Sequence, residues 1–256
     1  MADTGYGRYL SETYDALNTD IEYEAWADFY EKCFEKFADV KVRNVCEMAC
    51  GTGNMAILMA KRGYNVTAFD LSEDMLTAAD RKMFDEGVQN LRFTRQDMRS
   101  FKVYSKVQGV ICMLDSINCL LDNDSVLDTF ESVYNALDDG GVFIFDVNSK
   151  YKFENVYSDN AYILEDEKVL LAWQNFYNAK TKKCDLYLTF FLEDEDGRYT
   201  RFDEHNKQKM HTVKVLDKLL DKAGFSVEAR VSGFDFADAD ESRDERIFFI
   251  CTKKKA

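Results

Sequence analysis

The sequence predicts an α/β fold: a doubly wound, mostly parallel seven-stranded sheet with a small antiparallel β insert. Strand-sized apolar segments alternate with helix-sized amphipathic segments over residues 43–147, which is typical of a parallel sheet with helices on both faces. From about Tyr151 to His211, segments with a period of two residues replace the helices. A further helix and two strands then return to the first pattern, so the insert follows the fifth parallel strand.

The elements of the main sheet follow in order along the chain. Two apolar stripes at helical spacing predict two helices within residues 1–40. Ser72, which two acidic residues follow, is a good N-cap, and Gly224 is expected to end the last helix. Strands are expected at residues 43–49, 65–69, 91–94, 107–113, 141–147, 225–231 and 246–252, and helices at residues 55–61, 72–83, 124–137 and 213–223.

The insert is expected to form a separate antiparallel sheet. The segment Asp194–Gly197 has the composition of a hairpin turn between two of its strands. The chain therefore divides into a main domain of residues 1–150 and 211–256, which begins with the helical segment 1–40, and an insert of residues 151–210. The strands of the insert are expected at residues 162–164, 168–177, 184–192 and 199–209.

The composition limits the partners that this protein can have. The chain carries 33 Lys and Arg against 47 Asp and Glu, a net charge of −14, and its one basic cluster is Lys253–Lys255. Such an acidic surface repels phosphate backbones, so nucleic acid is not expected as a partner. A membrane is not expected either, because no apolar run reaches the roughly 20 residues of a membrane helix and no signal peptide is visible at the start.

Cysteine and histidine usage points to a reducing compartment and to no metal site. The seven cysteines lie in segments that we expect to be buried, so a cytoplasmic location is expected. The chain has two histidines, His205 and His211, and no second pair at zinc-site spacing accompanies Cys46 and Cys50. The oligomeric state is left open by the sequence.

The segment from Val45 to Asn54 joins a strand to a helix through Gly51 and Gly53. Glycines at this point let a ligand approach the backbone, and the helix N-terminus offers free N–H groups. With Ala56, the same spacing satisfies the relaxed dinucleotide fingerprint. An NAD-dependent oxidoreductase is therefore one alternative, and a cofactor-binding module without turnover is another.

Carboxylates at three successive strand ends favour a ligand without phosphates. Glu47 lies four residues before Gly51, where a carboxylate would repel a pyrophosphate but suit an ammonium group. Asp70 closes the second strand and could accept hydrogen bonds from both hydroxyls of a ribose. Asp97 follows the third strand and could accept one from an adenine amino group. A ligand with adenine, ribose and a cationic amino-acid end is S-adenosylmethionine.

The motif Glu47-x-Ala49-x-Gly51-x-Gly53 resembles the first motif of class I S-adenosylmethionine-dependent methyltransferases, which have a Rossmann-like fold. Ala49 replaces the usual first glycine, and a small side chain should be tolerated there. The segments 66–76, 96–98, 112–118 and 138–146 resemble the family's later motifs, and the segments 14–17, 23–26, 201–205 and 244–246 resemble a bacterial small-molecule subgroup.

The resemblance implies a role for each matching residue in binding S-adenosylmethionine, whose product is S-adenosylhomocysteine. Glu47 would face the methionine ammonium, and Asp70 would hold the ribose. Leu71 and Met75 would lie beside the adenine, and Leu114 would line the methionine side. The whole cofactor-binding set expected is Tyr14, Glu47, Ala49, Gly51, Gly53, Asn54, Asp70, Leu71, Met75, Asp97, Met98 and Leu114.

The expected reaction is methyl transfer to a small-molecule acceptor by in-line displacement, with the insert over the acceptor. Orientation and exclusion of water do most of the work in such a step, and a general base is needed only for an acceptor that is protonated. Asp115 and His205 are the candidates for that base. Arg201 and His205 share one face of the last insert strand and Phe202 the other, and the pattern leaves open which face points at the acceptor.

Overall fold

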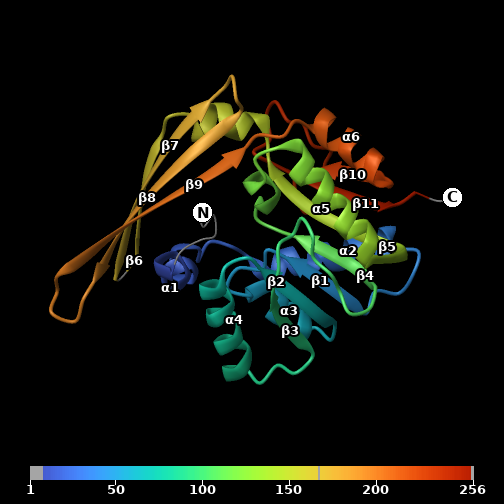
Figure 1. Cartoon of the computed structure of the whole chain (residues 1–256), viewed down its shortest axis with the longest axis horizontal. Helices are drawn as coiled ribbons and strands as arrows, with labels where there is room; N and C mark the ends of the chain where they lie inside the picture. Colours follow the sequence, from blue (N-terminus) through green and yellow to red (C-terminus); the bar gives the residue numbers. More distant parts are fainter. Residues whose placement is uncertain (1–7, 167, 255–256) are drawn as a thin grey trace.

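The computed structural model describes residues 8–166 and 168–254, and it contains two sheets (Figure 1). Parallel pairing runs through the larger sheet except at its one reversed strand, which lies antiparallel to both neighbours. This arrangement confirms the predicted fold class. In spatial order, the larger sheet consists of β10 (Phe225–Val231), the reversed strand β11 (Arg246–Lys253), β5 (Leu137–Asn148), β4 (Val107–Cys112), β1 (Asn44–Met48), β2 (Asn65–Asp70) and β3 (Leu91–Arg95).

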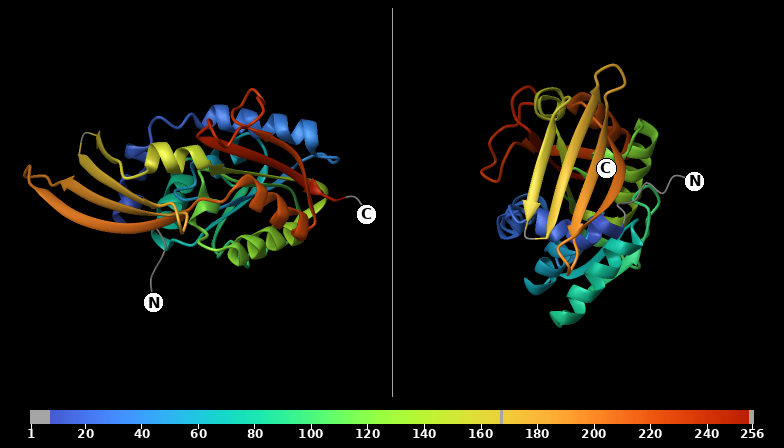
Figure 2. Two further views of the ribbon diagram at one scale, coloured as in Figure 1. Left: turned by 90° about the horizontal axis from the view of Figure 1, so that it is seen from above. Right: turned by 90° about the vertical axis from the view of Figure 1, so that its left-hand side faces the viewer.

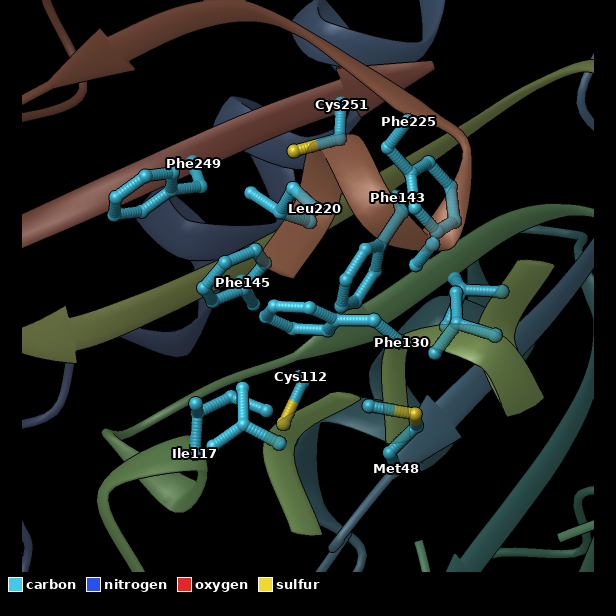
Figure 3. Packing of buried hydrophobic residues seen from close by; sticks show 14 of the residues in the cluster. Met48, Cys112, Ile117, Phe130, Phe143, Phe145, Leu220, Phe225, Phe249 and Cys251 are labelled. Carbon is cyan, nitrogen blue, oxygen red and sulfur yellow. The ribbon is translucent and has the colours of Figure 1, made fainter. Parts of the chain in front are cut away.

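Helices cover both faces of the larger sheet because side chains alternate along its buried strands. Val45 belongs to the apolar cluster on one face, and its neighbour Cys46 belongs to the cluster on the other. In the second cluster the rings of Phe145 and Phe249 stack 4.9 Å apart (Figure 3). The first face is covered by α2 (Tyr23–Phe37), α3 (Asn54–Lys61) and α4 (Glu73–Asp85), and the second by α5 (Asn123–Ala136) and α6 (Val213–Ala223).

The smaller sheet projects away from the larger one as a curved blade (Figure 2). The turn predicted at Asp194–Gly197 is confirmed, because the Gly197 N–H donates to the Asp194 carbonyl at 2.9 Å. In spatial order, the sheet consists of β6 (Ala161–Asp166), β7 (Val169–Asn178), β8 (Lys183–Glu193) and β9 (Tyr199–Lys209), all antiparallel.

The two faces of the smaller sheet differ in what they contact. One face buries Leu171 and Phe190 in an apolar cluster with Met75 of α4. Tyr14 and Leu17 of α1 (Arg8–Leu17) pack against the same cluster, since α1 lies between α4 and the smaller sheet (Figure 1). We call this face of the smaller sheet the inner face and the opposite one the outer face.

Four local features differ from the sequence predictions. Residues Lys152–Tyr157 form a short π-helix where no element was expected, and Ser116–Cys119 form a 3₁₀ turn. β5 begins at Leu137, before the Gly140–Gly141 pair, because the ladder with β4 shifts register there and continues. Cys119 is exposed, whereas the other six cysteines are buried as expected. Within the described part of the chain, no helix is long and apolar enough to cross a bilayer.

Candidate active site

The carboxyl ends of β1, β2 and β4 lie side by side, because β1 pairs with both neighbours in parallel. After β1 the backbone turns through positive φ values at Ala49 (51°), Gly51 (53°) and Gly53 (79°). After β4 it does so at Leu114 (54°) and Asp115 (53°). Non-glycine residues adopt this conformation rarely and at a cost, and such residues cluster at functional sites. Open α/β sheets bind ligands at this edge, so we place the candidate site here.

The two glycines after β1 serve different needs. A Cβ added to Gly51 would meet no atom within 4 Å, so this part of the backbone is open to a ligand. A Cβ added to Gly53 would lie 2.6 Å from the Phe93 ring and 2.9 Å from the Ala79 side chain. Glycine at position 53 therefore allows close packing of the loop, and glycine at position 51 leaves space.

Glu47 carries a buried carboxyl group with an unused oxygen. The residue is 1% exposed, and its Oε2 has no hydrogen-bond partner within residues 8–166 and 168–254. Burial raises the pKa of Glu47 to about 8, and the neighbouring Asp70 carboxylate adds to this rise. A cation that reached Oε2 would stabilise the ionised form, so the carboxyl group fits an ammonium ligand.

Asp70 is held in place by the backbone around it. Its Oδ2 accepts from the Gly51 N–H at 2.9 Å, and its Oδ1 accepts from the Ser72 N–H at 2.8 Å. Burial raises the pKa of Asp70 in spite of these bonds. Each oxygen of a carboxylate has a further acceptor site, so hydroxyl groups can still donate to Asp70.

The residues expected around an adenine differ in their surroundings. Leu71 is 39% exposed beside Asp70, whereas Met75 is buried in the cluster under the smaller sheet. Asp97 accepts three side-chain hydrogen bonds and one backbone hydrogen bond from Arg99, which lower its pKa. Met98 packs against the cluster that α5 and α6 cover.

Helix α1 is fastened to the glycine loop by Asp15, a residue that the sequence reasoning did not single out. Its Oδ1 accepts from Thr52 Oγ1 at 2.7 Å and from Asn54 Nδ2 at 2.8 Å. Its Oδ2 pairs with Lys82 Nζ at 2.7 Å. The Asn54 amide N–H is thus engaged with α1. The contact holds Tyr14 near the strand ends, where burial is the main cause of its raised pKa and the nearby Asp115 carboxylate adds to it.

Asp115 lies at the centre of a polar network that joins β4, β5, β9 and β11. Its Oδ2 accepts from Gln208 Nε2 at 2.7 Å, and its Oδ1 lies 3.2 Å from Arg246 Nη2. The Arg246 guanidinium also pairs with Asp146, which accepts the Asp115 N–H at 2.9 Å. On its other side the guanidinium lies 5.6 Å from the centroid of the Trp26 ring. Both carboxylate oxygens of Asp115 are therefore engaged.

His205 lies on the outer face of β9, which argues against its predicted role as a base. Its Nε2 lies 2.7 Å from Asp185 Oδ1, and its ring stacks on Tyr187 at 4.3 Å. Side chains alternate along a strand, and Gln208, which contacts Asp115, is on the inner face. His205 therefore points away from the strand ends.

Asn118, at the end of the motif-like segment 112–118, belongs to the polar network, and sequence reasoning missed its partners Asn148, Tyr157 and Gln208. Asn118 Oδ1 accepts from the Asn148 N–H, and Asn148 Nδ2 donates to the Tyr157 hydroxyl and to Gln208. No local motif marks Asn148, Tyr157 or Gln208, because their partners come from segments far apart in the chain. The phenylalanine- and tyrosine-rich pattern after β5 was the one available signal for Tyr157.

The strand order, the open glycine loop and the buried Glu47 define a class I S-adenosylmethionine-dependent methyltransferase. The family described as "Methyltransferase domain" matches residues 45–141. A methyltransferase-family protein of Geobacillus sp. (strain WCH70) is 32% identical over 94% of this chain and 96% of its own length. The chain belongs to the S-adenosylmethionine-dependent methyltransferase family, whose methyl donor is S-adenosylmethionine.

Solved structures agree with this assignment. The crystal structure of an S-adenosylmethionine-dependent methyltransferase from Clostridium acetobutylicum ATCC 824 has a TM-score of 0.86 and 30% identity, and it covers 96% of this chain and 98% of that one. Another relative is the dTDP-3-amino-3,4,6-trideoxy-alpha-D-glucopyranose N,N-dimethyltransferase of Streptomyces venezuelae. It is 29% identical over 40% of this chain and 40% of its own length. The matching family and the relatives named here are methyltransferases and not NAD-dependent oxidoreductases.

Proposed function

We propose that this protein transfers the methyl group of S-adenosylmethionine to a small-molecule acceptor by in-line displacement. The observation that carries the proposal is the unused Oε2 of Glu47, buried at the end of β1 next to the open backbone of Gly51. A buried carboxyl group of this kind suits the ammonium of a methionine moiety, which favours its ionised form, whereas a pyrophosphate would disfavour that form. When bound, S-adenosylmethionine supplies a methyl group on a sulfonium.

The residues of the chain have distinct proposed roles toward the donor. Glu47 pairs with the ammonium, and Asp70 accepts from the ribose hydroxyls while the backbone holds it in place. The open backbone at Gly51 admits the methionine part, and Leu114 lines it. Helix α1, fastened through Asp15, covers the site and excludes water.

On the acceptor side, we propose that residues 151–210 cover a pocket at the strand ends, while residues 1–150 and 211–256 bind the donor. The amino-sugar N,N-dimethyltransferase named above acts on a small molecule, which supports an acceptor of that size. We place Asp115 on the wall of this pocket, where it orients groups through Gln208 and Arg246. It takes a proton only from an acceptor that is protonated at neutral pH.

Calorimetric titration with S-adenosylmethionine, S-adenosylhomocysteine and NAD tests the proposal. We expect the first two to bind and NAD to give no signal. Glu47→Gln should weaken both by about 10- to 100-fold, the value of a charge-assisted hydrogen bond. Glu195→Gln, in the exposed hairpin turn, is the matched control and should leave both unchanged. Binding of NAD alone would refute the proposal.

Formation of S-adenosylhomocysteine separates an enzyme from a binding module without turnover. We would incubate the protein with S-adenosylmethionine and a panel of small amines, hydroxy compounds and carboxylic acids, and measure S-adenosylhomocysteine by mass spectrometry. Release above the acceptor-free rate with at least one compound supports turnover.

A further inference from the structure

Lys152 is a largely buried cation with little to neutralise it. Its side chain is 17% exposed, and among the described residues its one carboxylate contact is with Glu245 Oε2, at 3.9 Å, which is beyond hydrogen-bond distance. Its ammonium lies 5.4 Å from the centroid of the Tyr157 ring. Burial is the main cause of the lowered pKa of Lys152, with the Asp115 carboxylate opposing the shift and the Arg246 guanidinium adding to it. The ammonium therefore lies within electrostatic reach of the network at the end of β4.

Both oxygens of Asp115 and the Oδ2 of Asp146 are already engaged with other groups, whereas Asp146 Oδ1 is buried and has no hydrogen-bond partner among the described residues. Asp115 binds Arg246 and Gln208, and Asp146 binds Arg246 and a backbone N–H. Two carboxylates thus share one guanidinium, and neither makes a hydrogen bond to Lys152 in the part of the chain that the structure describes. The Lys152 side chain is 17% exposed, so its ammonium is open to a ligand that brings a hydrogen-bond acceptor.

The inner face of the smaller sheet, which meets Tyr157 through Trp173, offers further hydrogen-bond donors. The Tyr157 ring meets the Trp173 ring edge-on at 5.7 Å, and Trp173 Nε1 donates to Asn175 Oδ1 at 2.6 Å. Because an indole N–H can only donate, this bond fixes the orientation of the Asn175 amide. Asn175 Nδ2 then points elsewhere, 1% exposed as a residue and without a partner among the described residues. On the inner face of β9, Asn206 Nδ2 is likewise buried and unpaired there.

We propose that Lys152 and the Asn175 amide bind an anionic oxygen group of the methyl acceptor, so that the acceptor is a small molecule with a carboxylate or a phosphate. The proposal rests on the proposed function and names the substrate class for the same site. Ammonium and amide N–H groups only donate, so their common partner is an oxygen acceptor. In a chain of net charge −14, a largely buried cation whose ion pair with Glu245 is as long as 3.9 Å offsets the repulsion that an anionic ligand meets elsewhere.

Intrinsic fluorescence gives a readout that does not depend on turnover. The chain has two tryptophans: Trp173 contacts Tyr157 at this site, and Trp26 lies on the other side of Arg246. The protein saturated with S-adenosylhomocysteine would be titrated with benzoate, with inorganic phosphate and with neutral benzamide. We expect a saturable change with benzoate or phosphate and none with benzamide. Benzoate alone would indicate a carboxylate acceptor, and phosphate alone a phosphorylated one.

Variants then test whether Lys152 is responsible. Lys152→Met should weaken binding of the anion at least about tenfold, and Lys152→Arg should keep most of the affinity because it keeps the charge. Lys150→Met is the matched control: this lysine is two residues away, 46% exposed and paired with Glu154, and its loss should change nothing. Thermal unfolding of each variant checks that the fold is intact. If Lys152→Met fails to fold, the affinities of Lys152→Arg and of the wild type for the anion are compared at rising salt, and this comparison decides.

Three outcomes would overturn the inference. Benzamide could bind as well as benzoate, or neither anion could give a saturable change, or Lys152→Met could bind the anion as wild type does. A tenfold loss of S-adenosylhomocysteine affinity in Lys152→Met would assign the ammonium to the carboxylate of the donor and would refute the acceptor site. Calorimetry with S-adenosylhomocysteine comes first, because absence of its binding to the wild type would refute the proposed function instead.

Discussion

Binding of S-adenosylmethionine should release a proton from Glu47. In the ligand-free protein, burial and the nearby Asp70 raise the pKa of Glu47 to about 8, so at pH 7 about 0.9 of the molecules carry the proton. A cation at Oε2 favours the ionised form and lowers a carboxyl pKa by about 1 to 3. The bound state would then release between about 0.4 and 0.9 proton at pH 7.

The same linkage fixes the sign of the pH dependence of affinity. Because binding releases a proton, affinity should fall as the pH is lowered below 8, by at most about tenfold per pH unit. The fall should end where the pKa of the bound form is reached. The measurements belong at or below pH 7, since the α-amino group of the ligand itself loses its proton near pH 8.

Calorimetry in buffers of different ionisation enthalpy measures this proton directly. The slope of the observed binding enthalpy against the buffer's ionisation enthalpy equals the number of protons exchanged. Glu47→Gln should reduce the slope to near zero, and Glu195→Gln should keep the wild-type slope. A wild-type slope near zero at pH 7, with tight binding retained, would refute the assignment of Glu47 to the ammonium.

Three further predictions concern stability, helix α1 and the outer face. Gly53→Ala should lower the free energy of unfolding, measured in urea, by about 1 to 3 kcal/mol, because its Cβ would lie 2.6 Å from Phe93. Gly51→Ala should lower it less but should weaken S-adenosylmethionine binding. An equal loss of stability in the two variants would contradict the packing argument. Asp15→Ala should speed hydrogen exchange in α1 and weaken donor binding, with exposed Asp20→Ala as the control; unchanged exchange would show that the contact with Thr52 is dispensable. His205→Ala should leave S-adenosylhomocysteine formation within about twofold of wild type, whereas a hundredfold loss would restore His205 as a base.

The local pattern of the sequence was sufficient for the fold class and for placing Glu47 and Asp70 at the edge of the sheet. Alternating apolar segments predict the strands, and Ser72 and Gly224 bound their helices as expected, since the Ser72 hydroxyl accepts from the Met75 N–H and Gly224 has a φ of 97°. Glu47 and Asp70 come directly from strand-end positions, and parallel strands bring their carboxyl ends to one edge. These features depend on residues that are close together in the chain, so they can be predicted from the sequence alone.

Only the tertiary structure shows which residues lie around Asp115, on the proposed acceptor side of the site. Period-two alternation shows that His205 and Gln208 lie on opposite faces of β9, but packing against α1 and α4 determines which face is inner. The contact between Gln208 and Asp115 joins residues 93 positions apart. Asp115 and Asp146 both pair with Arg246, and neither makes a hydrogen bond to Lys152 in the described part of the chain. Such properties belong to pairs of distant segments, because burial and charge pairing arise only when the chain has brought those segments together.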